Sequence, residues 1–456
     1  MDQYYKSFAK KHSEGYDDIE KALNVVKKFI QKKKLVLYGG LAIDLSLKHT
    51  GEKGIYSDDV IPDYDFYSPN HIEDSYELAD ILHSLRLLNI SSISALHIST
   101  RRVRVNFEVV ADISYMPKEI FDQLPTIKVN GINVIHPDFQ RMDFHRSFCG
   151  LFKDPPTEVI FNRLNKDITR FNLLALAYPI KQPKYKVKYK TVKLEKIDDV
   201  YGGFVAYSAI LFIYNKLARG ELGIKLDLKV KDDIKLTAKS VEIPDLTGTW
   251  EETSNIVICT DDYKKYKGKF TYYEKYIDDY RPQAAVKPGY EIWDIKGQLI
   301  PCYDMNTFGI DLVITNYQYV MLFFLQRYFS TKNKAFLYFY KEMENMIADV
   351  EKEVAKLNLS DELLYDMQKI LPFFITDSYF GCCNWSSSHI KYMIETRERI
   401  DNVPMKDRTV FRERFGYYPA NYETPSKDNW DEINIDEYNF MKFSGKKIDS
   451  LFAYQL

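Results

Sequence analysis

The sequence predicts a mixed α/β (α+β) protein of two domains, and two observations support this prediction. The first is a short apolar strand that ends in a glycine pair and enters a helix, Leu35-Val36-Leu37-Tyr38-Gly39-Gly40. The second is a weaker copy of that pattern at Tyr201-Gly202-Gly203, again followed by a helical run. A length of 456 residues also exceeds what one ordinary hydrophobic core serves. We therefore expect domains at residues 1–183 and 184–456, divided near the proline- and lysine-rich stretch that follows Pro179.

Apolar residues three and four positions apart indicate helices, and alternating or β-branched residues indicate strands. Ser68-Pro69 marks a helix start, because proline is tolerated in the first turn. Asn130-Gly131 between two β-branched runs indicates a two-residue hairpin. In chain order the first domain is expected to contain a helix over 14–34, a strand over 35–38, a helix over 41–48, a strand at 62–66, a helix over 72–88, strands over 93–98 and 103–114, the hairpin at 127–134 and a helix over 154–176.

The second domain is expected to begin with an extended stretch and the copy of the glycine turn. Its C-terminal part has helical patterns over 318–328, 334–357 and 361–374, and a polar tail after Arg399 that wraps the surface. Where the copy should have paired acids, over 241–246, the sequence has none at that spacing. This predicts a second domain of the same fold that has lost its metal site, with a chance three-residue match as the alternative.

Asp63 and Asp65 are the central candidates for chemistry. Because side chains alternate across a strand, the two carboxylates share one face. The preceding pair Gly39-Gly40 lets backbone N–H groups approach a phosphate closely. Carboxylates beside such a turn are ligands of the kind that magnesium prefers. The combination predicts nucleotidyl transfer from a nucleoside triphosphate, provided that a third carboxylate joins the pair.

The third carboxylate is expected from the strand over 103–114. Asp112 follows apolar residues at the strand's end, which places it at the sheet edge; Glu108 has the same strand parity and competes with it. We prefer Asp112 for its terminal position. If the strand is unbroken, Arg102 and Arg104 project to the same side and would neutralise triphosphate or RNA phosphates. Arginines on strand surfaces are as often solvated or ion-paired, so that alternative stays open.

Two further basic patterns are candidate phosphate sites. On the expected helix over 154–176, cations recur on one face at Arg163, Lys166 and Arg170, which suits triphosphate binding or simply a solvated face. Further along, lysines alternate with tyrosines and a valine, so an extended strand would have one cationic and one aromatic face. That arrangement suits an RNA backbone, but it also protects an edge strand from aggregation. The lysines are Lys184, Lys186, Lys188 and Lys190.

Composition limits the class of protein. A formal net charge of −2 excludes a globally basic protein that coats nucleic acid, so any RNA surface must be local. The five cysteines have neither zinc-ligand spacing nor a disulfide framework. No apolar run is long enough to span a bilayer. We expect a soluble protein of a reducing compartment.

Four segments resemble the poly(A) polymerase catalytic subunits of large nucleocytoplasmic DNA viruses, of the giant virus, asfarvirus and poxvirus type. The resemblance is dense over about the first 180 residues and looser beyond. One departure is the gap between Gly40 and Asp63, which is longer than in the typical polymerase-β type pattern and fits a polar loop. The four segments are residues 37–44, 62–71, 110–116 and 135–141.

The resemblance implies a polymerase-β-like nucleotidyltransferase domain followed by a degenerate nucleotidyltransferase-like domain with added helices. It implies template-independent addition of AMP from ATP to the 3′ end of mRNA with release of pyrophosphate. Asp63, Asp65 and Asp112 would hold two Mg²⁺ or Mn²⁺ ions. Gly39 and Gly40 would bind the triphosphate of ATP.

The implied partners are ATP and a single-stranded RNA 3′ end, without a membrane. A homodimer and a separate processivity subunit both remain open, and the implied location is the host cytoplasm or viral factory, with packaging in the virion open. Two alternatives remain. One is a nucleotidyltransferase that acts on a tRNA end or a small molecule, and the other is a non-catalytic RNA-binding scaffold.

Overall fold

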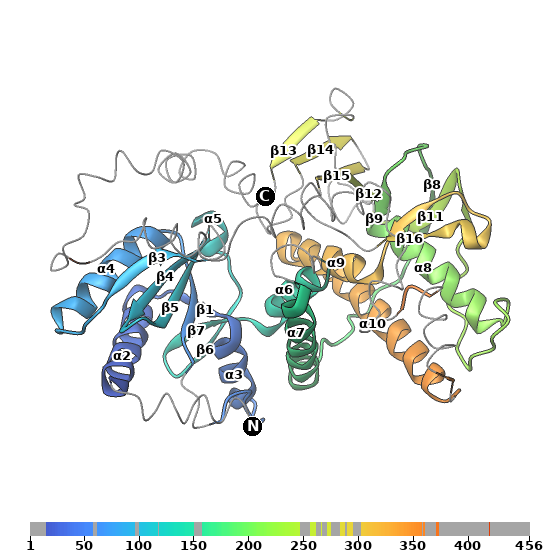
Figure 1. The fold of residues 1–456 in the computed structure, drawn as a ribbon. Helices are drawn as coiled ribbons and strands as arrows, with labels where there is room; N and C mark the ends of the chain where they lie inside the picture. Colours follow the sequence, from blue (N-terminus) through green and yellow to red (C-terminus); the bar gives the residue numbers. More distant parts are fainter. Residues whose placement is uncertain are drawn as a thin grey trace. The chain divides into compact units, whose positions relative to one another are not determined.

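The computed structural model describes most of the chain up to residue 357. By their contacts the residues form two compact units, which are described one at a time. The first holds the chain up to Gln140 together with Thr169–Pro179, and the second holds Arg141–Ile168 and the described residues of Ile180–Ile400 (Figure 1). The predicted boundary at 183/184 stays a prediction. The described residues are 15–57, 62–95, 100–116, 118–149, 157–246, 256–260, 266, 271–274, 283–287, 290–294, 302–357, 359–360, 371–373 and 419.

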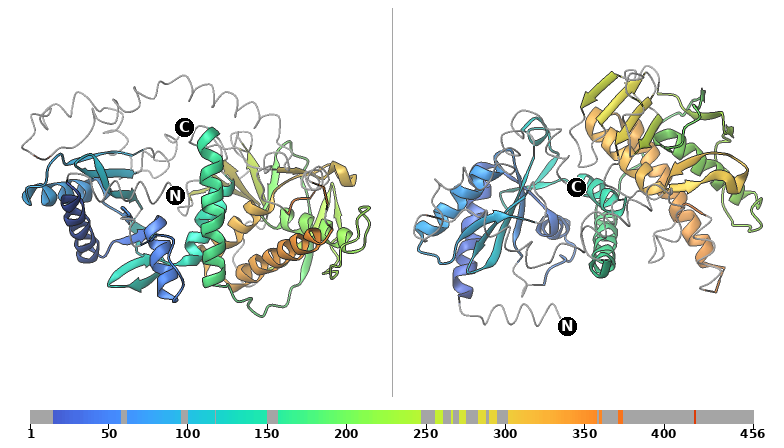
Figure 2. Two further views of the ribbon diagram at one scale, coloured as in Figure 1. Left: turned by 60° about the horizontal axis from the view of Figure 1, so that its bottom comes forward. Right: turned by 45° about the horizontal axis from the view of Figure 1, so that its top comes forward.

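The first unit is built on a mixed seven-stranded sheet in the order β3-β4-β5-β2-β1-β7-β6. Helices α2 and α4 lie side by side against this sheet (Figure 2), because their apolar faces, such as Val26 and Leu78, are completely buried. The elements are α2 (Tyr16–Lys33), β1 (Val36–Tyr38), α3 (Gly39–His49), β2 (Tyr64–Ser68), α4 (His71–Ser84), β3 (Ser91–Ser94), β4 (Thr100–Val105), β5 (Glu108–Tyr115), α5 (Lys118–Phe121), β6 (Thr126–Val129) and β7 (Ile132–Ile135).

The predicted single strand over 103–114 is wrong: it is a hairpin of β4 and β5. Asn106 and Phe107 have φ values of 49° and 66° and form the turn between the two strands. Asparagine adopts this left-handed conformation more readily than most residues. Apolar alternation continues on both sides of the turn, which made the pair look like one strand. The antiparallel register places Arg102 opposite Asp112.

Other differences are local. Helix α3 begins at Gly39 rather than Leu41, and α4 ends at Ser84 rather than Leu88. The predicted strand over 93–98 is β3 at Ser91–Ser94, and its remainder lies partly outside the described residues. The hairpin at Asn130-Gly131 is confirmed, with φ values of 49° and 78° at its two turn residues.

The second unit contains a second seven-stranded sheet, ordered β13-β14-β15-β12-β9-β17-β16, and a three-stranded sheet, β10-β11-β8. The predicted helices over 318–328 and 334–357 are confirmed, while the one over 361–374 and the tail lie essentially outside the described residues. The elements are α6 (Pro137–Cys149), which starts in the first unit, α7 (Thr157–Ala177), which ends in the first unit, β8 (Tyr189–Lys193), β9 (Val200–Gly202), α8 (Gly203–Ala218), β10 (Leu236–Thr237), β11 (Ser240–Pro244), β12 (Ile256–Thr260), β13 (Thr271–Glu274), β14 (Gln283–Lys287), β15 (Tyr290–Asp294), β16 (Cys302–Asp304), β17 (Val313–Thr315), α9 (Tyr317–Thr331) and α10 (Lys334–Ala355).

The two large sheets have the same topology, which confirms the predicted repeat. Strand β9 pairs antiparallel with β12 and parallel with β17, as β1 pairs antiparallel with β2 and parallel with β7. The next pair along is parallel in both sheets, β2 with β5 and β12 with β15. The glycines match with a shift of one residue. Gly39 and Gly203, with φ values of 72° and 58°, each begin the helix that follows the strand.

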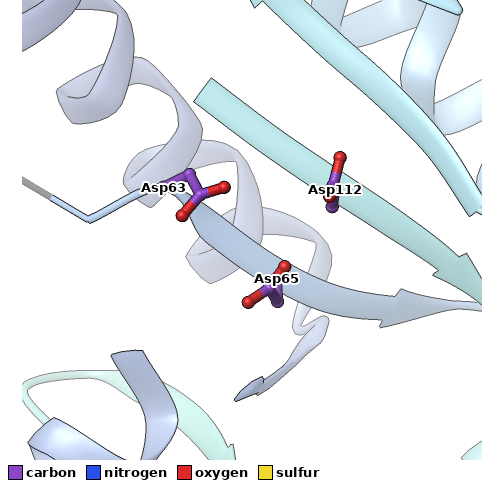
Figure 3. Close-up of side chains that lie close together, drawn as sticks. All are labelled: Asp63, Asp65 and Asp112. Carbon is purple, nitrogen blue, oxygen red and sulfur yellow. The ribbon is translucent and has the colours of Figure 1, made fainter. Parts of the chain in front are cut away.

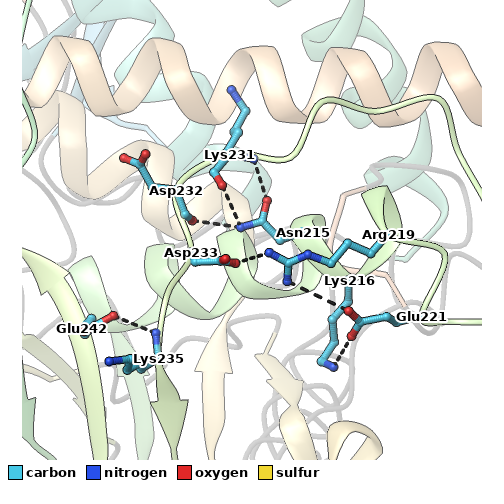
Figure 4. A network of polar contacts seen from close by, with 9 residues as sticks. All are labelled: Asn215, Lys216, Arg219, Glu221, Lys231, Asp232, Asp233, Lys235 and Glu242. Carbon is cyan, nitrogen blue, oxygen red and sulfur yellow. Dashed lines mark hydrogen bonds and ion pairs between the residues drawn. The ribbon is translucent and has the colours of Figure 1, made fainter.

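The inserted three-stranded sheet is tied to helix α8 by a polar network (Figure 4). The Asn215 side chain donates to the carbonyl oxygen of Asp232 at 2.9 Å and accepts from the backbone N–H of Lys231 at 2.8 Å. Arg219 forms an ion pair with Asp233. These contacts attach the segment before β10 to the end of α8. Within the described residues, no helix is long and apolar enough to cross a membrane.

Candidate active site

Three carboxylates of the first unit converge on the neighbouring strands β2 and β5 (Figure 3). Asp63 directly precedes β2, and Asp65 is its second residue, so alternation turns both to one face. Strand β5 runs parallel to β2 with Asp112 paired to Asp65. One oxygen from each carboxylate lies within 4.8 Å of the others. The structure thus brings together the three acids predicted from the sequence, whereas Glu108 lies at the exposed start of β5 and outside this group.

The electrostatics of this acidic cluster fit a cation. Burial, together with the negative charges of Asp63 and Asp112, raises the pKa of Asp65 to about 8. Carboxylates this close repel one another, and a divalent ion coordinated by their oxygens would relieve that repulsion. The donor set therefore suits Mg²⁺ or Mn²⁺, which prefer oxygen ligands.

Arg102 reaches the cluster through the β4–β5 hairpin rather than through strand parity. Its Nε and Nη2 donate to the two carboxylate oxygens of Asp112 at 2.8 and 2.6 Å. A carboxylate oxygen has two lone pairs, so this fork leaves each oxygen one more acceptor site. Arg104 extends from the same strand, and its Nε donates to Ser91 Oγ at 3.0 Å. Of the two predicted strand arginines, Arg102 thus pairs with an acid of the cluster.

The glycine pair brings α3 against the cluster. A Cβ on Gly39 would lie 2.3 Å from Asp65 Oδ2, and one on Gly40 would lie 2.2 Å from Tyr56 Oη. Neither position has space for a side chain. No side chain caps the start of α3, whose first N–H groups and dipole favour negative charge. The two glycines thus leave room for Asp65 and Tyr56 to lie beside the start of α3.

Two half-buried residues lie next to the turn, and the sequence pointed to only one of them. Tyr56 lies in the loop after α3, where its backbone N–H donates to Asp44 Oδ1 at 3.0 Å. Arg170, on α7, donates from Nη2 to Tyr56 Oη at 3.5 Å. Arg170 belonged to the predicted basic stripe, so the stripe was a usable signal. Tyr56 had none, because it is one of 36 tyrosines.

The other two members of that stripe have a different setting. Lys166 is exposed and belongs to the second unit, whereas Arg170 belongs to the first. Arg163 lies on α7, but its side chain is outside the described part of the chain. The predicted role of both in ATP binding therefore stays a prediction.

The lysine run is only partly a strand, because β8 begins at Tyr189. The predicted alternation nevertheless holds, because exposed lysines alternate with half-buried residues over 184–188. Tyr185 packs against Tyr338 and Phe339 of α10, with ring centroids 5.7 and 5.8 Å apart. Lys190 forms an ion pair with Asp245 at 3.1 Å. The cations that are exposed to solvent are Lys184, Lys186 and Lys188.

The second unit has a different set of residues at the equivalent place. Val257 occupies the position of Asp65, because each pairs with the last strand residue before the glycine-initiated helix. Glu291, paired with Val257, occupies the position of Asp112. Glu291 is completely buried and forms an ion pair with Arg327, while Trp293 Nε1 donates to it at 2.7 Å. Its charge is thus balanced within the protein.

Comparisons with known proteins agree with this architecture. The family model for the poly(A) polymerase catalytic subunit matches residues 24–154. A protein of African swine fever virus, named as a poly(A) polymerase catalytic subunit, is 31% identical over 415 residues, which cover 84% of this chain and 83% of that protein. One of Acanthamoeba polyphaga mimivirus, named likewise, is 31% identical over 159 residues, which cover 35% of this chain and 26% of that protein.

A solved structure extends the likeness of fold to nearly the whole chain. The crystal structure of the Megavirus polyadenylate synthase has a TM-score of 0.61 at 17% sequence identity, and it covers 97% of this chain and 86% of that one. The segment matched by the family model contains the glycine turn and all three acids of the cluster. With a relative 31% identical over most of both proteins, the chain belongs to the poly(A) polymerase catalytic subunit family.

Proposed function

We propose that this polynucleotide adenylyltransferase adds AMP from ATP to the 3′ end of messenger RNA without a template, at a site where Asp63, Asp65 and Asp112 hold two divalent metal ions. The observation that carries the proposal is the convergence of these three carboxylates beside the uncapped start of α3. When bound, the ions would polarise the RNA 3′ hydroxyl and stabilise charge on the entering and leaving oxygens.

The residues of the chain divide the remaining work. Asp63 and Asp65 offer carboxylate oxygens from one strand, and Asp112 offers them from the next. Arg102 fixes the Asp112 carboxylate with two hydrogen bonds while leaving acceptor capacity for an ion. The first N–H groups of α3, uncovered at Gly39, are suited to the phosphates of ATP. Positioning and charge stabilisation, rather than covalent chemistry, account for phosphoryl transfers of this kind.

The substrate assignment is tested by incorporation of single nucleotides. The full chain is incubated with an oligo(A) RNA primer, Mg²⁺ or Mn²⁺, and one labelled nucleoside triphosphate at a time. We expect a ladder of extended products with ATP, one pyrophosphate released per addition, and no extension after chelation of the metal. Preferred use of CTP on a tRNA end, or transfer to a small molecule instead of RNA, would support the second nucleotidyltransferase alternative. Absence of any transfer would support a non-catalytic scaffold.

Gly39→Ala is expected to lower AMP incorporation by about 100-fold or more, because its Cβ would displace Asp65 from the cluster. Gly51→Ala is the matched control. Gly51 also has a positive φ, of 84°, but nothing lies within 4 Å of its added Cβ. Both variants bear the same backbone strain, and only the first has the clash. Equal activity of the two variants in the primer assay would show that the glycine turn does not position Asp65.

The exposed lysines Lys184, Lys186 and Lys188 are proposed to contact RNA phosphates, since Tyr185 anchors the segment to α10. Replacing all three with glutamate should weaken binding of a fluorescent oligo(A). It should also reduce the slope of log affinity against log salt by about 2. The control replaces Lys21, Lys28 and Lys32 on α2, which changes the net charge equally. A salt slope that falls equally in both variants would mean that the effect is one of overall charge.

A further inference from the structure

The guanidinium of Arg170 lies beside Gly40, and the proposed chemistry gives it no role. Among the described residues, the Arg170 guanidinium has one hydrogen bond, the long 3.5 Å contact to Tyr56 Oη, and no ion pair. A guanidinium has five donors in a fixed planar fork. Arg170 is half-buried, and within the described part of the chain its other donors have no protein acceptor. Such a group is suited to an anionic ligand.

The absence of a side chain at Gly40 brings this pair to the start of α3. A Cβ there would lie 2.2 Å from Tyr56 Oη and 3.3 Å from Arg170 Nη2. On the adjacent residue, Gly39, the space is taken by Asp65 Oδ2 instead. Consecutive glycines therefore place an acidic group and a basic pair beside one helix N-terminus. The positive charge of Arg170 also acts on Asp65, where it partly opposes the rise in pKa that burial causes.

This arrangement matches the charge along a metal-bound nucleoside triphosphate. The reacting α-phosphate would be held beside the acids, and the β- and γ-phosphates carry most of the negative charge of the triphosphate. A guanidinium binds phosphate oxygens with two parallel hydrogen bonds. The start of α3, between the acids and Arg170, adds N–H donors along the same path.

We infer that Arg170 binds the β- and γ-phosphates of ATP and that Tyr56 positions its guanidinium. This inference rests on the proposed function. The position of Tyr56 is itself fixed from α3, because Asp44, only 3% exposed, accepts its backbone N–H and forms an ion pair with Lys48 at 2.8 Å. The loop between the glycine pair and the acids thus supplies the Tyr56 hydroxyl that accepts the hydrogen bond from Arg170.

The test compares Arg170→Met, Arg170→Lys and the control Lys28→Met, an exposed cation on α2 of the same unit. In the primer assay, Arg170→Met should raise KM for ATP by about 10- to 100-fold, with KM for the primer unchanged. Arg170→Lys should recover part of this loss, because it keeps the charge but not the fork. Binding of inorganic tripolyphosphate with Mg²⁺, measured by calorimetry without RNA, should weaken by the same factor in Arg170→Met. Tyr56→Phe should give a smaller change of the same kind.

Three results would overturn the inference. They are wild-type tripolyphosphate binding by Arg170→Met, a rise in KM for the primer instead of ATP, and a loss in Lys28→Met as large as in Arg170→Met. Thermal unfolding of each variant confirms that it is folded. Failure of the proposed function is distinguishable, because the wild-type chain itself would then fail to extend a primer with ATP.

Discussion

Asp65→Asn is expected to lower AMP incorporation by at least about 1,000-fold, because a neutral amide cannot replace a carboxylate that coordinates the metal ions. The same change should stabilise the metal-free protein at neutral pH. Asparagine has nearly the same shape and is always neutral, so its folding does not require the proton uptake that the raised pKa of Asp65 imposes on the wild type at that pH. Loss of activity with a gain of stability distinguishes a functional acid from a structural one. The control is Glu20→Gln, which changes an exposed carboxylate on α2.

The stability gain has a definite pH dependence. Burial and the two neighbouring carboxylates raise the pKa of Asp65 from 3.8 to about 8. Between these values the folded chain keeps a proton that the unfolded chain releases. The free energy of unfolding of the metal-free wild type therefore falls as pH rises from about 4 to about 8, by about 6 kcal/mol from this group. Asp65→Asn should lack that decline in urea unfolding with EDTA present. An unchanged decline would show that Asp65 is ionised without its metal.

The second large effect is expected at the equivalent place in the second unit. Arg327→Met should lower the free energy of unfolding by about 3 to 5 kcal/mol, because it removes the cation that balances the buried charge of Glu291. The double variant Glu291→Gln with Arg327→Met removes both charges and should recover most of the loss. Unfolding is followed by tryptophan fluorescence, since Trp293 donates to Glu291.

Activity is the discriminating readout for this pair. The double variant should extend a primer at close to the wild-type rate per folded molecule, because the second unit has valine where the first has Asp65. A double variant as unstable as Arg327→Met would mean that the pair does not act as one unit. A folded double variant without activity would mean that the second unit takes part in the chemistry.

Sequence alone predicted the features that depend on local pattern. The strand, glycine pair and helix at 35–48 follow from neighbouring residues, and so does the common face of Asp63 and Asp65. The second copy at Tyr201 was found in the same way. Its alignment with Tyr38 was one residue out, because three shared letters do not show which glycine has the positive φ and begins the helix.

Features that depend on pairing between distant strands were predicted less well. Arg102 was selected on the assumption of an unbroken strand, yet it reaches Asp112 across a hairpin turn at Asn106. The approach of Tyr56 and Arg170 depends on a contact between residues 114 positions apart. No periodicity in the chain encodes that distance. The buried ion pair of Glu291 and Arg327 likewise depends on a contact between residues that are distant in the sequence.

Metal binding by the full chain tests the central claim most directly. Mn²⁺ is titrated in the presence of ATP and without RNA, and bound ion is followed by electron paramagnetic resonance. The account predicts that the wild type binds two ions per chain, that the double variant at Glu291 and Arg327 does the same, and that Asp65→Asn loses them. Retention of both ions by Asp65→Asn would contradict the claim that the acidic cluster of the first unit is the metal site.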